Sequence, residues 1–195
     1  ALNMPPFKQY LDQLAGQFQE RRRESTPSRP VSEKALEIGQ LPFDRPIWMY
    51  GLRDPDWLLP NKPADARKVM FLMLGKGSDG AQQAEEQRED DVGRLSRAIP
   101  LYLAESAYEW TTLHAQSLVT AVMGGGPVVF GAQDDSGERE TATRLAELAE
   151  LVVQGSITVE GDRWTITVSL RETAKGDLVA TETKSSHMQG LEAAV

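Results

Sequence analysis

The clearest pattern of apolar and polar positions lies in residues 151–185. In its middle part, apolar and polar side chains alternate, with Trp164, Ile166, Val168 and Leu170 on one side and Thr165, Thr167 and Ser169 on the other. A period of two predicts a strand that is buried on one face only. Turns at Gly161-Asp162 and at residues 174–177 separate this strand from a strand on either side. The stretch therefore predicts a three-stranded antiparallel meander.

Three further patterns predict the elements before the meander. Residues 69–74 form a continuous apolar run, which is typical of a strand covered on both faces. Residues 98–117 repeat apolar positions at spacings of three and four, which predicts a helix with Pro100 in its first turn and His114 on its buried face. Residues 117–123 predict a second strand. The pair Asp135 and Glu138 resembles a capping box, so another helix should begin there.

The first 67 residues have a different character. Their apolar residues Phe7, Tyr10, Leu11, Leu14 and Phe18 predict one amphipathic helix, and residues 24–34 have the composition of a linker. Residues 36–63 contain five prolines, which exclude a long helix or a central strand. Large side chains in this stretch, among them Trp48 and Trp57, should lie along a surface and bury their rings there, and the expected surface is the chain's own domain. An aromatic groove for proline-rich ligands is the alternative. Whether the helix packs on its own domain or docks on a partner stays open.

Together these elements predict an α+β fold, a three-helix-flanked mixed sheet ending in an antiparallel meander, with an N-terminal helical and proline-rich arm. We divide the chain into the arm, residues 1–67, and an α/β domain, residues 68–195. Ser185 or Ser186 is expected to cap a last helix. Because its apolar face is cut short at the last residue, we expect the parent chain to continue.

Composition excludes several classes of function. The chain has no cysteine, so disulfides, thiol catalysis and thiolate zinc sites are excluded. It has no apolar run of about 18 residues, so we expect no membrane span in this chain. Residues 69–195 carry 10 Lys and Arg against 20 Asp and Glu, and an acidic body of this kind argues against nucleic acid as a partner.

No catalytic constellation is visible, and we predict no enzyme activity, no cofactor and no metal. The two histidines, His114 and His187, lie far apart in the sequence, and no serine-nucleophile motif accompanies either. An alternative hypothesis is a nucleotide or small-ligand-binding protein that uses the glycine-rich loops from Gly75 to Gly80 and from Gly124 to Gly126. It predicts a pocket in which Lys76 and Ser78 lie beside Gly125. The first loop fits the letters of a dinucleotide fingerprint, but no β-α-β unit follows it.

The end of the chain resembles the TolB N-terminal-type α/β domain of bacterial envelope proteins. The resemblance covers about residues 68–185 and is carried by Val153-Gln154-Gly155-Ser156-Ile157, by the hairpin from Gly161 to Leu170, and by Lys175-Gly176-Asp177. The family's L-P-F phrase in its first strand is replaced by Leu72-Met73-Leu74, and Gly124-Gly125-Gly126 is extra. The resemblance implies protein docking without catalysis, in the periplasm or at the inner face of the outer membrane, as in lipoproteins. The cytoplasm stays open.

We therefore predict a non-catalytic protein-protein interaction or assembly domain of a bacterial envelope-associated protein. The partner is another protein or a second copy of the chain. The predicted partner-binding residues are aromatic or apolar: Phe7, Tyr10, Leu14, Phe18, Trp48 and Trp57.

Overall fold

A mixed β-sheet organises the protein. The computed structural model describes residues 38–53, 57–59, 62–77, 91–122, 126–127 and 129–187, all of which belong to one compact unit, residues 36–195. The strands are β1 (Ile38–Phe43), β2 (Lys68–Leu72), β3 (Gly75–Gly77), β4 (His114–Val122), β5 (Gly126–Pro127), β6 (Leu151–Glu160), β7 (Arg163–Glu172) and β8 (Leu178–His187). They run in the order β1-β4-β2-β6-β7-β8, with β3 beside β6 and β5 beside β4.

The sheet has a parallel centre and antiparallel ends. Strands β4, β2 and β6 are parallel, while β1 is antiparallel to β4. At the other end, β6, β7 and β8 pair antiparallel in sequence order, so the predicted meander is confirmed. Gly161 has a φ of 62°, the left-handed conformation that its tight turn requires.

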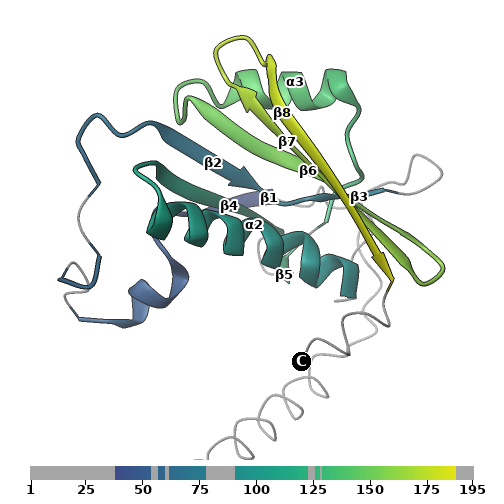
Figure 1. The fold of residues 1–195 in the computed structure, drawn as a ribbon, viewed down its shortest axis with the longest axis horizontal. Helices are drawn as coiled ribbons and strands as arrows, with labels where there is room; N and C mark the ends of the chain where they lie inside the picture. The colour runs from purple at the N-terminus through teal and green to yellow at the C-terminus, as the bar shows by residue number, and fades with distance from the viewer. Residues whose placement is uncertain are drawn as a thin grey trace, which may run out of the picture. The chain divides into compact units, whose positions relative to one another are not determined.

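The predicted three-helix-flanked sheet is wrong. In the described part of the chain two α-helices flank the sheet, α2 (Asp91–Trp110) and α3 (Asp135–Arg144), and a short 3-10 helix, η1 (Ile47–Gly51), accompanies them (Figure 1). The helix predicted around Phe7 to Phe18 lies outside the described residues. One helix on each face is enough to cover the central strands of the sheet.

Strand β2 contributes to a core on each face. Val69 and Phe71 pack below α2 with Ala104, Ala115, Leu151 and Val153. Met70 packs on the other face, below α3, with Leu118, Ala142, Leu145, Ala149 and Val152. This two-sided burial confirms the interpretation of the apolar run and explains why β2 shows no alternation.

Helix α2 lies earlier in the sequence than predicted. It ends at Trp110, and His114 is the first residue of β4 rather than a residue on a helix face. Pro100 stands in the middle of α2, where it leaves the carbonyl of Ser96 without its usual helical donor. The backbone N–H of Leu74 donates to that carbonyl at 3.0 Å, and the Ser96 hydroxyl donates to the carbonyl of Leu74. The proline thus leaves one carbonyl of α2 available to the segment that follows β2.

The start of α3 also differs from the predicted capping box. The N-cap is Asp134, whose carboxylate accepts a hydrogen bond from the backbone N–H of Gly137 at 2.8 Å. Asp135 and Glu138 instead bind the guanidinium of Arg171 on β7. The arginine side chain is 3% exposed, and a buried cation requires carboxylate partners that a local sequence pattern does not reveal.

The two edge strands, β1 and β8, both contain residues for which the sequence predicted a different structure. Strand β1 comes from the proline-rich stretch, and its Pro42 is tolerated because β1 is an edge strand. At the other edge, β8 includes Ser185 and Ser186, so neither residue caps a last helix.

Candidate protein-docking site

Helix η1 is held in one orientation by its tyrosine. The Tyr50 ring meets the Phe43 ring edge to face, with 5.9 Å between the centroids. Its hydroxyl donates to the Asp44 carboxylate at 2.7 Å, and the backbone N–H of Asp44 donates back to that hydroxyl at 3.0 Å. The hydrogen bond from Tyr50 lowers the pKa of the Asp44 carboxyl. Met49 is buried, whereas Trp48 and Tyr50 on either side of it in η1 are exposed.

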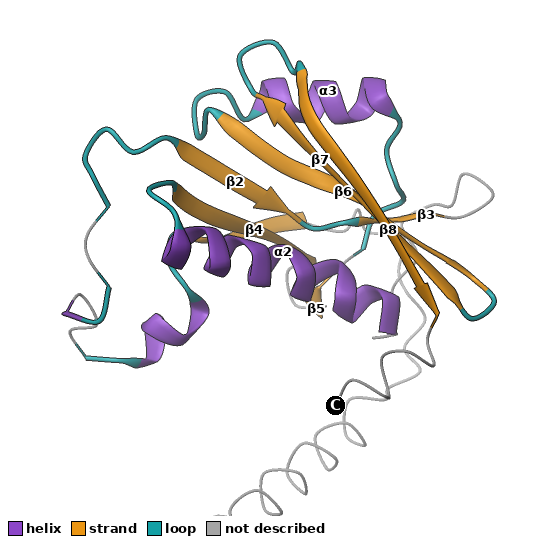
Figure 2. Cartoon of the chain, viewed as in Figure 1, coloured by secondary structure: helices purple, strands orange, loops and turns teal. Residues whose placement is uncertain are grey.

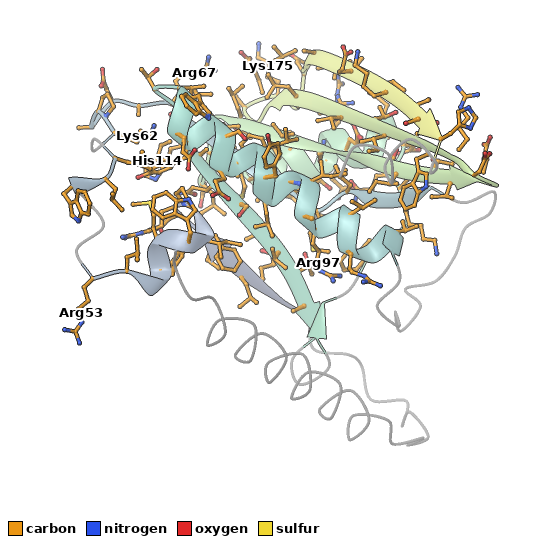
Figure 3. The ribbon with its side chains drawn as sticks, turned by 60° about the horizontal axis from the view of Figure 1, so that its bottom comes forward. Arg53, Lys62, Arg67, Arg97, His114 and Lys175 are labelled. Carbon is orange, nitrogen blue, oxygen red and sulfur yellow. The ribbon has the colours of Figure 1, made fainter. Side chains whose placement is uncertain are left out.

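The same segment is fastened to the C-terminal end of α2. Trp48 Nε1 donates to the Glu109 carboxylate at 3.3 Å. Lys62 Nζ donates to the carbonyls of Tyr108 and Thr111, the second at 2.7 Å, and lies 4.6 Å from the centroid of the Tyr108 ring. A cation at a helix C-terminus satisfies carbonyls that have no helical donor. Burial lowers the pKa of Lys62. In Figure 3, Lys62 lies at this end of α2 and Arg97 lies toward the other end.

Large apolar side chains remain exposed at this end of the domain. We call them the aromatic surface: Ile47, Trp48, Tyr50, Leu52, Trp57, Leu58 and Trp110. Trp57 and Trp110 are 79% and 82% exposed, and Trp48 is 37% exposed. Tryptophan is among the most buried residue types on average, so two tryptophans this exposed make this end of the domain a candidate interaction site.

The structure describes two of the six predicted partner-binding residues. Trp48 and Trp57 are exposed in and after η1, so the expectation that their rings are buried against the domain is wrong. Phe7, Tyr10, Leu14 and Phe18 lie outside the described residues. Partner binding by all six stays a prediction. The sequence analysis missed Trp110, because it extended the helix to residue 117, seven residues past the end of α2, and so did not expect Trp110 at a helix end.

The segments that follow β2 and β5 meet through β3. The backbone N–H of Lys76 donates to the carbonyl of Phe130 at 2.8 Å, and the N–H of Ala132 donates to the carbonyl of Lys76 at 2.9 Å. A Cβ on Gly75 would lie 2.6 Å from the Cα of Ala132, so this close approach requires glycine. Ser78 and Gly125 lie outside the described residues, as do Gly80 and Gly124, so the predicted pocket of Lys76, Ser78 and Gly125 stays a prediction.

A cavity of about 370 Å³ lies beside this junction, near the carboxyl ends of β2 and β4. Its apolar lining includes Leu72, Met73, Leu118, Phe130 and Leu145, and its neutral polar lining includes Gln40, Thr120, Gln133, Thr141 and Gln154. The charged lining residues are already paired, Glu138 with Arg171 and Arg144 with Glu140. The cavity is therefore suited to a neutral molecule.

The described residues offer few other chemical features. Among them, no group of three or more His, Asp or Glu side chains is placed to hold a metal ion. Of the helices within the same residues, none has the length and apolar character needed to cross a membrane.

Comparisons with known proteins give a distant likeness. No protein-family model and no curated protein matches the chain. The LpoB C-terminal domain from Salmonella enterica is similar at 14% identity and a TM-score of 0.35, over 65% of this chain and 87% of that chain. Lipoprotein GNA1162 from Neisseria meningitidis is similar at 9% identity and a TM-score of 0.35, over 66% of this chain and 91% of that chain. Neither likeness transfers a function, and the resemblance to TolB N-terminal-type domains stays a prediction.

Proposed function

We propose that this chain is a non-catalytic docking domain of a bacterial envelope-associated protein, and that it binds a protein partner through the aromatic surface. The observation that carries the proposal is the exposure of Trp57 and Trp110 at 79% and 82%. Tryptophan and tyrosine are enriched among the residues that dominate binding energy at protein interfaces.

The contacts that hold η1 and the segment after it favour binding as well. The Tyr50–Asp44 hydrogen bonds and the contact of Lys62 with the end of α2 fix the segment before any partner arrives. A site that is already ordered loses less conformational entropy on association. Phe7, Tyr10, Leu14 and Phe18 stay predicted partner-binding residues on sequence grounds alone.

The envelope part of the proposal rests on the resemblance to TolB N-terminal-type domains. One departure that we noted from that family was the missing L-P-F phrase in the first strand. The letters L-P-F occur at Leu41-Pro42-Phe43 in β1, outside the stretch of about residues 68–185 that carries the resemblance, so this departure stands.

The docking proposal is tested by removing the two exposed indoles. We expect Trp57→Ser with Trp110→Ser to abolish retention of a protein that the wild-type chain retains from an envelope extract. Because both side chains are exposed, the melting temperature should stay within about 2 °C of the wild type.

Tyr102→Ser is the matched control. Tyr102 is 69% exposed on the same helix, eight residues or about 12 Å before Trp110. This variant should retain the same protein as the wild type. Equal retention by the double tryptophan variant would overturn the proposal, as would equal loss in the control.

A second candidate function is binding of a small neutral ligand in the cavity beside Gly75. The observation that favours it is the position of the cavity near the carboxyl ends of parallel strands, where open α/β sheets bind ligands. Leu118→Trp would fill part of the cavity. A neutral compound that raises the melting temperature of the wild type, but not of this variant, would support binding at this place.

A further inference from the structure

Strand β8 is an edge strand without a cover. All ten of its residues are exposed, and within the described residues it pairs only with β7. Helix α2 lies mainly on β4, β2, β6 and β3, and α3 lies on β6 and β7 (Figure 2). A long edge strand of this kind presents unpaired backbone N–H and C=O groups to any strand that approaches.

The charges on β8 are arranged symmetrically about one residue. Glu182 and Lys184 flank Thr183 and point to the same face of the sheet, opposite Val168 and Ile166 of β7. Their side chains are both exposed and form an ion pair of 2.7 Å along the strand. Around them β8 carries small or hydroxyl side chains: Ala180, Thr181, Thr183, Ser185 and Ser186.

This arrangement complements itself when a second strand runs antiparallel. With the two Thr183 residues opposite each other, Glu182 of each copy faces Lys184 of the other. Thr181 then faces Ser185, and Ala180 faces Ser186. Opposite charges and paired hydroxyl side chains across neighbouring strands are both favourable.

Neighbouring registers are less favourable. A register centred on Glu182 would set the two Glu182 carboxylates against each other, and one centred on Lys184 would do the same to the two ammonium groups. A shift of the register by one residue would turn the second sheet over, so that each pair would join a side chain from one face of the first sheet with a side chain from the other face of the second. The charges therefore select the register centred on Thr183.

We propose that β8 pairs antiparallel with β8 of a second copy of this chain, in the register centred on Thr183, so that the two sheets continue into one. Both faces of β8 lie beyond the main contacts of α2 and α3, which leaves room for the added strand. The proposal is independent of the aromatic surface, because it uses a different part of the domain.

A disulfide across the two-fold axis tests the register. The natural chain has no cysteine, so Thr183→Cys introduces the sole thiol. In the proposed dimer the two Thr183 Cα atoms lie about 4.5–5.5 Å apart, within the range that a disulfide spans. We expect Thr183→Cys to form a covalent dimer under mild oxidation at low micromolar concentration.

Two controls make the cross-link specific. In the proposed register Thr181 of one chain faces Ser185 of the other, so the two Thr181 residues are offset by four positions, about 13 Å along the strand. Thr181→Cys alone should therefore not cross-link. A mixture of Thr181→Cys and Ser185→Cys chains should form the mixed dimer. Equal cross-linking of Thr183→Cys and Thr181→Cys would overturn the proposed register.

Charge reversal tests the same dimer without a thiol. Glu182→Lys sets like charges opposite each other in both symmetric pairs, so the dimer dissociation constant should rise about ten-fold or more. The swap Glu182→Lys with Lys184→Glu should restore it, as measured by light scattering or sedimentation. Trp57→Ser with Trp110→Ser should leave it unchanged. A wild-type chain that stays monomeric throughout the concentration series would overturn the proposal, and β8 would then be open to a strand from a different protein.

Discussion

Strands β2 and β8 belong to the same sheet and have opposite surroundings. In β2, Val69, Met70 and Phe71 are all buried, alternately under α2 and under α3. In β8, all ten residues are exposed. The two sequences differ accordingly, since β2 is continuously apolar after Lys68 and β8 is rich in threonine and serine. The comparison teaches that the position of the helices, more than the sheet itself, decides which strands are core and which are available for contacts.

The surfaces proposed for binding both lie away from the covered centre. The aromatic surface is formed by η1, the segment after it and the last residue of α2, and β8 is the outer strand of the meander. Substitutions at the centre should therefore change the free energy of unfolding, and substitutions at these two surfaces should change association instead. The following predictions test that division.

The largest effect is expected where α3 is fastened to the meander. Arg171 Nε and Nη2 both lie 3.2 Å from one Glu138 carboxylate oxygen, and Nη1 donates to the carbonyl of Gly176 at 3.0 Å. Arg171→Met would leave Glu138 largely buried without its cation. We expect a loss of about 3–5 kcal/mol in the free energy of unfolding, measured by urea denaturation.

The double variant distinguishes the ion pair from packing. Arg171→Met with Glu138→Leu removes both charges, so its loss should be smaller than the sum of the two single losses. Strict additivity would mean that the two side chains stabilise the fold separately.

The next prediction compares the loss of stability caused by a substitution in β2 with that caused by a substitution in β8. Met70→Ala removes a side chain that is 3% exposed in the core below α3, and it should cost about 2–5 kcal/mol. Val179→Ala removes an exposed side chain from β8 and should change stability by no more than about 0.5 kcal/mol. Thermal or urea unfolding of both variants measures the contrast. Similar losses in the two strands would contradict the contrast between a covered strand and an exposed one.

The smallest effect concerns the pH dependence of stability. The hydrogen bond and the charge of Arg171 lower the pKa of Asp135 in the folded protein. A carboxyl whose folded-state pKa lies below the unfolded value of about 3.9 stabilises the fold above that pH. This contribution is lost as the pH falls through the folded-state pKa. Asp135→Asn should therefore reduce the decline of the melting temperature below about pH 4.

Other carboxyls contribute in the same direction, so the difference between variants is the measurement. Tyr50 lowers the pKa of Asp44, and Lys184 lowers the pKa of Glu182. In an Arg171→Met background, Asp135→Asn should have no further effect on the pH profile. A profile of Asp135→Asn that coincides with the wild type would contradict the assignment of this pair.

Local patterns in the sequence were sufficient where one residue's neighbours along the chain decide its environment. The alternation around Trp164 predicted the meander, and the apolar run of β2 predicted a strand covered on both faces. The predicted boundaries of α2 were wrong, because apolar residues at helical spacing continue past its end. Pro100 is one cause, since the expected first-turn position is in fact the middle of α2.

The sequence by itself determined the strand pattern and the absence of cysteine, and it singled out Trp48 and Trp57 as candidate partner-binding residues without predicting their exposure. Only the tertiary structure decided that β1 pairs with β4, that Arg171 binds Glu138 and Asp135, which stand 33 and 36 residues away, and that Trp110 is exposed. The physical reason is the distance along the sequence over which each influence acts. Strand and helix periods act over a few neighbouring residues, whereas sheet order, buried ion pairs and exposure depend on which distant segments the core brings together.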